Sequence, residues 1–346
     1  MPAILTHDFF GRDALPTVSA QLGFISMEEH DAFLLGNQGP DPLFYLVADP
    51  RVPASNRVGD LLHHARPSQL LAALHDSVSM LSRDERAVGQ AYAAGFLCHY
   101  VLDSSMHPLV YAQEYALCDA GVEGLDRSAS GVVHAEIERD LDEMVLYHKT
   151  GRTVADYKPY REVLQADDRT LAIIDKMYFY LCLWTYSITV DLDCYSSAVK
   201  AFRLVQHLFY TPGRGKMRVI APLERTFGRR RYSLYAAMSH RDRAEDSSAF
   251  ANEGHEAWAN PFTGEVTQDS FWDIYEDALS RATDACEVML ARDADERVAE
   301  TITRGLNFSG MPCDPDDPKG PDEPGPGEVP QVPAGWTPAP AGERRP

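Results

Sequence analysis

Apolar residues recur at spacings of three and four along most of the chain, a pattern that indicates helices rather than strands. It predicts helices over residues 67–81, 83–103, 130–148, 171–190, 196–209, 271–290 and 295–302. Pro67 stands in a first turn and Gly151 just beyond a helix, the places where helices favour these two residues. Period-two alternation is rare and short. We therefore predict an all-α fold, a multi-helix bundle.

The composition changes near residue 309. Of the 23 prolines, 11 fall within residues 310–346, with glycine, aspartate and glutamate between them. Such a segment buries too little apolar surface to offset the entropy lost on ordering. We predict one helical domain over residues 1–308 and a disordered tail over residues 309–346.

The charge of the chain limits its partners. With 52 acidic and 32 basic residues, the formal net charge is −20. A protein this acidic repels a polyanion, so we expect no binding of long nucleic acid. One basic stretch departs from this trend, and it is either a solvated loop or helix end, or a contact for phosphate or anionic lipid: Arg214, Lys216, Arg218, Arg225, Arg229, Arg230 and Arg231.

Features that mark secretion or membrane insertion are not found in the sequence. The N-terminus lacks a basic leader with an apolar run, and no stretch reaches the roughly 18 apolar residues of a membrane-spanning helix. The six cysteines include no Cys-x-x-Cys pair, which is typical of reduced thiols in the cytosol. We expect a cytoplasmic protein, and the sequence does not indicate its oligomeric state.

Residues of the metal-ligand type share one stripe of a predicted helix. His99, Asp103 and His107 are four apart, which places their side chains within roughly 80° of one another. His134 and Glu138 repeat the spacing on the next periodic helix. Burying such groups without partners costs several kcal/mol. The pattern favours a site for divalent metal over the alternative, a structural polar network.

Three further ligand-type residues lie upstream, in short segments that each have a simpler interpretation. Asp41 stands between two prolines, where it is also a typical turn residue. His7 is also consistent with an exposed terminal residue. His63 and His64 are adjacent, and neighbours on a helix point about 100° apart, so only one of them can be a ligand of a given ion.

The order of these histidines and carboxylates along the chain resembles that of the bacterial zinc-dependent phospholipase C family, in particular a branch without a leader. They are more distantly similar to the single-strand-specific zinc nucleases. The phrases that carry the resemblance are GNQGPDPLFY, GFLCHYVLDSSMHP, HAEIERDLDEM and the segment from His255 to Glu265.

The resemblance implies a helical fold around two or three Zn²⁺ ions and hydrolysis of a phosphodiester, a phospholipid or a similar ester. It assigns one ion to Asp41, His63, His99 and Asp103. A second ion would bind His107, His134 and Glu138. His7 and a bridging Asp103 would hold the third. Secreted members complete that third site with an N-terminal Trp, whereas this chain begins Met1-Pro2, so we expect the third ion to be weaker, differently ligated or absent.

The expected chemistry is attack by activated water, because zinc lowers the pKa of a bound water towards about 7. We assign Asp41 the catalytic role of orienting that water, besides binding metal. His255 is a candidate proton donor or a structural contact of Trp258. Five aromatic residues are candidates either for the wall of an apolar substrate pocket or for the core: Phe9, Phe10, Phe44, Tyr45 and Tyr100.

Three alternatives stay open. The first is a metal-dependent nuclease or nucleotidase on the same fold. The second is an HD-type phosphohydrolase built on the pairs His7-Asp8 and His75-Asp76, which leaves the other histidines unexplained. The third is a non-enzymatic helical module in which zinc only staples helices together, and it predicts a closed coordination shell.

Overall fold

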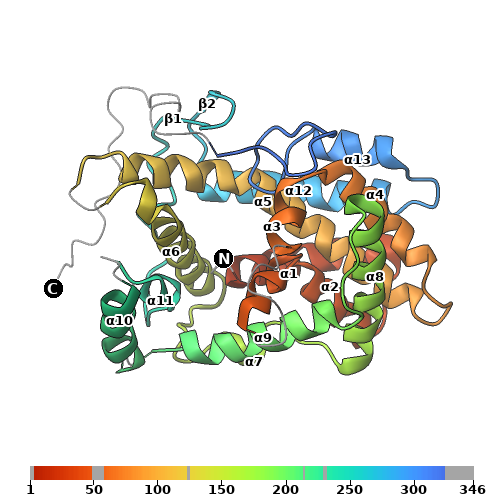
Figure 1. Cartoon of the computed structure of the whole chain (residues 1–346), viewed down its shortest axis with the longest axis horizontal. Helices are drawn as coiled ribbons and strands as arrows, with labels where there is room; N and C mark the ends of the chain where they lie inside the picture. The colour runs from red at the N-terminus through yellow and green to blue at the C-terminus, as the bar shows by residue number, and fades with distance from the viewer. Residues whose placement is uncertain (1–3, 49–57, 123–124, 213–214, 229–231, 324–346) are drawn as a thin grey trace.

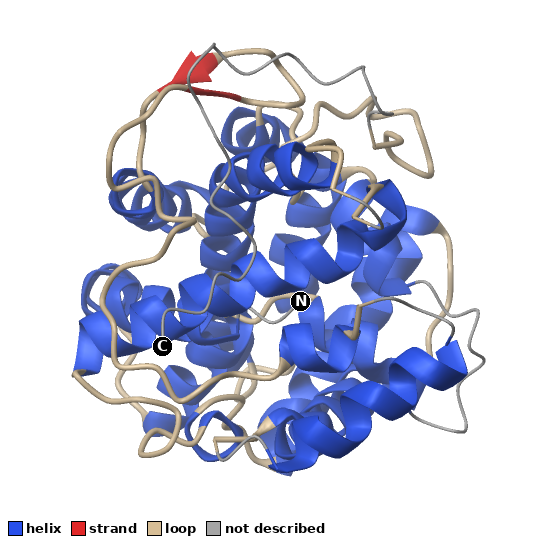
Figure 2. Cartoon of the chain, turned by 90° about the vertical axis from the view of Figure 1, so that its left-hand side faces the viewer, coloured by secondary structure: helices blue, strands red, loops and turns tan. Residues whose placement is uncertain are grey.

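The computed structural model describes residues 4–48, 58–122, 125–212, 215–228 and 232–323, and it confirms the all-α prediction. Helices make up most of this part of the chain (Figure 2). The strands found there form one short antiparallel hairpin, β1 (Trp258–Ala259) with β2 (Val266–Thr267).

The helices follow one another along the whole described chain (Figure 1). In order they are α1 (Ile4–Leu22), α2 (Met27–Gly36), η1 (Asp41–Ala48, a 3₁₀ helix), α3 (Val58–His64), α4 (Pro67–Ser79), α5 (Arg86–Cys118), η2 (Arg127–Ala129, 3₁₀), α6 (Ser130–Thr150), α7 (Pro159–Glu162), α8 (Asp168–Tyr186), α9 (Cys194–Phe209), α10 (Gly215–Gly228), α11 (Leu234–Met238), α12 (Phe271–Met289) and α13 (Glu296–Thr303).

Helix α5 is the axis of the fold. It is buried along nearly its whole length and packs against α2, α4, α6 and α12. The crossing with α2 is close because glycines face each other there: a Cβ on Gly95 would lie 2.0 Å from the carbonyl oxygen of Phe33. A Cβ on Gly36 would lie 2.3 Å from the carbonyl oxygen of Tyr92. This contact brings the segment that follows α2 against the middle of α5.

The structure corrects two predicted helix ends. The helix predicted over residues 83–103 is longer than expected, because α5 continues through Pro108 to Cys118. Residues such as Leu109 and Val110 are buried beyond the proline, so their packing offsets the one backbone hydrogen bond that proline cannot make. Helix α8 ends at Tyr186 and not at residue 190. The next residue, Ser187, ends the helix because its backbone adopts the left-handed region at φ 57°.

The boundary of the predicted tail also differs. Residues 309–323, assigned to the tail, lie against the folded chain: Leu306 forms a bridge with Pro312, and the Cys313 thiol lies 3.1 Å from the carbonyl oxygen of His64. Burial of Phe308 and Met311 supplies the apolar contacts that the composition did not reveal. The rest of the predicted tail, residues 324–346, lies outside the described residues.

Two further sequence expectations concern membrane and redox chemistry. None of the described helices combines the length and apolarity needed to cross a bilayer. The six cysteines are free thiols, and all except Cys313 are buried. Cys98 and Cys286 come closest, with their sulfur atoms 3.8 Å apart between α5 and α12.

Candidate metal centre

Seven of the eight predicted ligands form two groups. Within each group, the ligand atoms lie within 4.8 Å of one another. The first group contains Asp41, His63, His99 and Asp103. The second contains His107, His134 and Glu138. Only His134 among them is partly exposed. Helix α5 supplies residues to both groups, so its stripe of His99, Asp103 and His107 joins them.

In the first group, two imidazoles face two carboxylates. Nε2 of His63 lies 2.9 Å from Oδ1 of Asp41. Nε2 of His99 lies 3.2 Å from Oδ2 of Asp103 and 3.7 Å from Oδ1 of Asp41. Asp41 starts η1 and His63 lies in the last turn of α3, so three separate elements meet at this point.

The other ring nitrogen of each histidine is already committed. Nδ1 of His63 donates to the carbonyl oxygen of Gly59 at 2.7 Å, and Nδ1 of His99 donates to that of Asn37 at 3.0 Å. A neutral imidazole has one N–H, so Nε2 then carries a lone pair. Nε2 of His99 and Oδ2 of Asp103 lack a hydrogen bond despite their closeness. Two buried lone-pair donors that face each other in this way fit a cation between them.

The second group repeats this arrangement. His107 donates from Nδ1 to the carbonyl oxygen of Phe308 at 2.7 Å, and His134 donates from Nδ1 to Oε2 of Glu114 at 2.8 Å. Their Nε2 atoms lie 3.4 Å and 3.2 Å from Oε1 of Glu138. Metal-binding histidines characteristically donate their second ring N–H to a carbonyl or carboxylate. All four histidines in the two groups do so.

The electrostatics of the groups favour bound cations. Burial alone would raise the pKa of Asp103, but His99, His107 and His7 hold it well below its ordinary value. Burial opposes charge at His134 too, yet Glu138 and Glu114 raise its pKa to about 10. Without a metal, a proton on His134 therefore balances the carboxylates. A divalent ion would supply that positive charge instead.

His7 lies beside the first group but outside it. Its Nε2 is 3.1 Å from Oδ1 of Asp103, and its ring stacks on that of His99 at 4.2 Å. Its Nδ1 is buried without a hydrogen-bond partner. A third ion would thus find His7 and Asp103 here, as the resemblance implies, and the existence of that ion stays a prediction.

Helix α1 holds His7 in place through a carboxylate from another helix. Asp142 of α6 accepts hydrogen bonds from the backbone N–H groups of Leu5 and Thr6, at 3.0 and 2.7 Å. These are first-turn amides that have no partner within α1. His240 also contacts Asp142, at 3.0 Å, so this anchor is itself supported.

The turn that carries Asp41 is fixed from both sides. The hydroxyl groups of three buried tyrosines converge on the carbonyl oxygen of Gly39, namely Tyr92, Tyr178 and Tyr195. Gly39 has a φ of 49°, and a Cβ there would lie 2.2 Å from the ring of His99. Only glycine allows the turn to approach the imidazole so closely.

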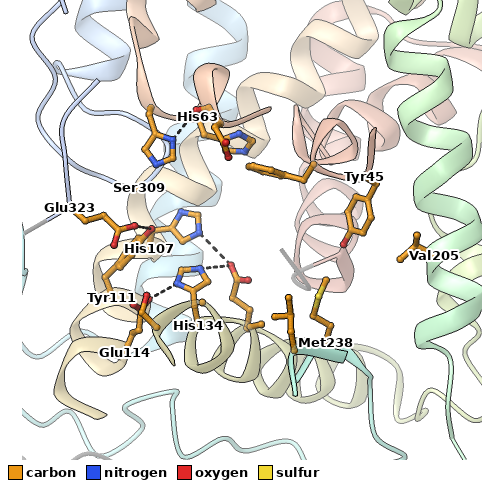
Figure 3. Close-up of a pocket in the computed structure, with 18 of the residues that line it drawn as sticks. Tyr45, His63, His107, Tyr111, Glu114, His134, Val205, Met238, Ser309 and Glu323 are labelled. Atoms are coloured by element: carbon orange, nitrogen blue, oxygen red, sulfur yellow. Dashed lines mark hydrogen bonds and ion pairs between the residues drawn. The ribbon is translucent and has the colours of Figure 1, made fainter. Parts of the chain in front are cut away.

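A cavity of about 560 Å³ opens beside the second group. Figure 3 shows His107 and His134 on one side of it, with Tyr45, Val205 and Met238 across from them. Apolar side chains such as Phe44, Phe209 and Leu234 contribute to the rest of its lining, together with polar and acidic residues such as Asp60, Ser130 and Glu323. A phosphate with an attached apolar group would therefore find ligands at one wall and hydrocarbon at the other.

Of the five aromatic residues that were candidates for either the pocket wall or the core, Phe44 and Tyr45 line the cavity. Phe9, Phe10 and Tyr100 belong to the core. Of the two adjacent histidines, His63 faces Asp41, while His64 donates from Nδ1 to the carbonyl oxygen of Asp60 and lies outside both groups.

Other candidates lie outside both groups. His255 is exposed in the segment around the β hairpin and contacts the carbonyl of Gln268, so it is no proton donor to this cavity. His75 pairs with Asp76 at the surface. Asp8 points to Arg12 and Tyr157. The pairs required by the HD-type interpretation are therefore not brought together.

Sequence reasoning missed two partners of the ligands. Glu114 lies seven residues beyond His107, two helical turns along the same face of α5, and this spacing was a usable signal. Phe308 accepts the hydrogen bond of His107 through its backbone carbonyl, a group that every residue has and that the sequence therefore cannot indicate. Its backbone N–H donates to the carbonyl oxygen of His63. Phe308 thereby connects the two groups.

Comparison of the chain with protein-family models, curated proteins and solved structures finds no match. A functional assignment therefore depends on the geometry of the two groups and on the motifs of the sequence.

Proposed function

We propose that this protein is a zinc-dependent phosphodiester hydrolase of the phospholipase C type. The observation that carries the proposal is the convergence of four histidines, each with Nδ1 committed, on three buried carboxylates beside an apolar cavity. The resemblance of the sequence to the zinc-dependent phospholipases, which involves the same ligand residues, supports the same proposal.

The ligand chemistry supports zinc over the harder cations. Calcium and magnesium bind almost entirely through oxygen, whereas zinc readily combines imidazole nitrogen with carboxylate oxygen. Both groups mix these donors. The second group offers three protein ligands, the number typical of a catalytic zinc, which keeps a position open. This favours an enzyme over a closed structural staple.

Bound zinc ions would activate water and offset negative charge on phosphoryl oxygens. The residues of the chain supply the positioning. Asp41, held at the start of η1, would orient the attacking water besides binding metal. His107, His134 and Glu138 line the cavity, so the phosphate of a substrate seated there meets this group.

The cavity supports a phospholipid or a similarly hydrophobic ester as the substrate. Its far wall, formed by residues such as Val205 and Met238, would exclude water and hold an apolar group. Long nucleic acid is disfavoured by the net charge of −20. A nuclease or nucleotidase on the same scaffold is the competing activity that the experiment must separate.

The test combines metal analysis with a substrate screen. The zinc-loaded chain is expected to contain two or three equivalents of zinc and to cleave phosphatidylcholine and bis-nitrophenyl phosphate until chelator is added. His99→Ala, Asp103→Ala and Glu138→Ala should each lower the rate by about 10³-fold, the loss of several kcal/mol of transition-state stabilisation. His75→Ala, at a surface histidine, is the matched control.

Preferred cleavage of mononucleotides or single-stranded DNA would replace the lipase proposal with the nuclease alternative. Stoichiometric zinc with no hydrolysis of any phosphodiester would favour the structural staple. Unchanged activity in the ligand variants would overturn the mechanism.

A further inference from the structure

We propose that helix α10 docks the protein on the surface of an anionic lipid bilayer. Two exposed aliphatic side chains, Val219 at 62% and Leu223 at 51%, lie one turn apart on this helix. Their spacing of four places them about 40° apart on one strip. Ala221, on the opposite side, is buried against the fold.

Basic residues flank the aliphatic strip on both sides. At about 100° per residue, Lys216 lies to one side of Val219 and Leu223, and Arg218 and Arg225 lie together on the other. Nζ of Lys216 donates to the carbonyl oxygens of His207 and Tyr210, at 2.8 and 3.4 Å, so its charge lies beside the end of α9. Arg218 and Arg225 form no ion pair with any described residue. An apolar strip between rows of bases is the pattern of helices that lie in a membrane interface.

The acid of α10 is turned away from this surface. Glu224 accepts hydrogen bonds from the Ser233 hydroxyl and from the backbone N–H groups of Leu234 and Tyr235, both at 3.1 Å. Its charge is therefore directed at the start of α11. The outer face of α10 is left cationic on a chain whose net charge is −20. This local reversal of charge is complementary to anionic headgroups.

The occupant is a bilayer rather than a nucleic acid because the strip is aliphatic. Single-stranded nucleic acids bind platforms of aromatic side chains between bases. The described outer face of α10 offers Val219 and Leu223 instead. Four more bases of this stretch lie outside the described residues: Arg214, Arg229, Arg230 and Arg231.

Docking by α10 would bring the cavity to the lipid. Helix α10 packs against α11, whose residues Leu234 and Met238 line the cavity, and Figure 1 shows the two helices together at one edge of the molecule. Binding to the bilayer does not depend on catalysis. Its purpose, the supply of a phospholipid to the cavity, rests on the proposed function.

The test is co-sedimentation of the full chain with vesicles. The chelated protein is expected to bind vesicles of phosphatidylcholine and phosphatidylglycerol, to bind phosphatidylcholine alone far less, and to release at high salt. Lys216→Gln with Arg218→Gln and Arg225→Gln should weaken binding about 100-fold, at about tenfold or less per base. Val219→Ser with Leu223→Ser should weaken it about tenfold.

Matched variants separate this face from general effects of charge and apolarity. Arg292→Gln with Arg297→Gln and Lys319→Gln makes the same charge change at exposed bases elsewhere. Val266→Ser with Val288→Ser removes aliphatic residues that are 56% and 50% exposed. Both controls should bind vesicles as the wild type does. All variants should keep their circular dichroism spectrum and their rate on soluble bis-nitrophenyl phosphate.

Absence of binding to anionic vesicles, or equal losses in the α10 variants and their controls, would overturn the docking proposal. Vesicle binding without hydrolysis of any substrate would leave docking intact and refute the enzyme. Hydrolysis by the protein, together with unaltered vesicle binding in the α10 variants, would support the enzyme and refute docking by α10.

Discussion

Oδ1 of Asp41 lies 2.9 Å from Nε2 of His63, and Nδ1 of the same histidine donates to the carbonyl oxygen of Gly59. A neutral imidazole has no second proton to place between Nε2 and the carboxylate. Two lone pairs therefore face each other in this contact, and a metal ion bound between them would satisfy both.

We predict that Asp41→Asn folds but loses one equivalent of zinc. The asparagine amide can donate to the lone pair of His63, so the ion-free variant should melt close to the ion-free wild type. It should lack about 3 kcal/mol of the stabilisation that zinc provides when present about 100-fold above its dissociation constant. Elemental analysis and thermal melts with and without zinc measure both effects.

The control for this variant is Asp76→Asn, because Asp76 pairs with His75 at a similar distance on the surface. It should retain every zinc equivalent. If Asp41→Asn also kept the full complement, Asp41 would not be a ligand.

Glu114→Gln should weaken zinc at the second group and leave the first unchanged. Glu114 is 1% exposed and fixes the tautomer of His134 through a 2.8 Å contact. Loss of such an outer carboxylate typically costs about 10–100-fold in metal affinity. Competition with a chromophoric chelator resolves the two affinities, so the first group serves as the internal control. Equal weakening of both groups would indicate general damage to the fold instead.

Zinc binding at the second group should release protons and strengthen as pH rises. Glu138 and Glu114 outweigh burial and raise the pKa of His134 to about 10, so His134 is protonated at neutral pH in the ion-free chain. Zinc must displace that proton, and the displacement becomes easier towards pH 10. Titration calorimetry in buffers of different ionisation enthalpy should show about one proton released from this residue. Buffer-independent heats would contradict the assignment.

The apolar wall of the cavity should matter for lipid and not for a small ester. Val205→Asn places an amide across the cavity from the second group, and we expect KM for phosphatidylcholine to rise about tenfold, the cost of about 1–3 kcal/mol for burying a polar group against hydrocarbon. The rate on bis-nitrophenyl phosphate should stay unchanged. Leu204→Asn, at the neighbouring 71% exposed position, is the control. Equal effects on both substrates would refute the role of this wall.

The sequence was most informative where ligands share a helix. His99, Asp103 and His107 fall on one stripe of α5 because spacing by four nearly repeats the helical turn, and the structure keeps them together. The same reasoning applies to His134 and Glu138 on α6. Local periodicity contains this information, so no knowledge of the tertiary fold was required.

Helical periodicity could not place the ligands that lie on elements other than α5 and α6. Helix α1 was not predicted, because its first turns are buried on every side and show no amphipathic period. His7 reaches Asp103 only because Asp142 anchors those turns. Resemblance to a family, and not spacing, was what joined His7, Asp41 and His63 to the stripe on α5. The contact of Phe308 with His107 involves the peptide group, which is identical in every residue.

Phe308 also determines when the centre can be completed. The ligands lie within the first 138 residues, but the carbonyl that fixes the His107 tautomer belongs to a residue about 170 positions later in the chain. A growing polypeptide can assemble α5 and α6 long before that carbonyl exists. In the proposed metalloenzyme, firm metal capture at His107 would thus be a late event in biogenesis.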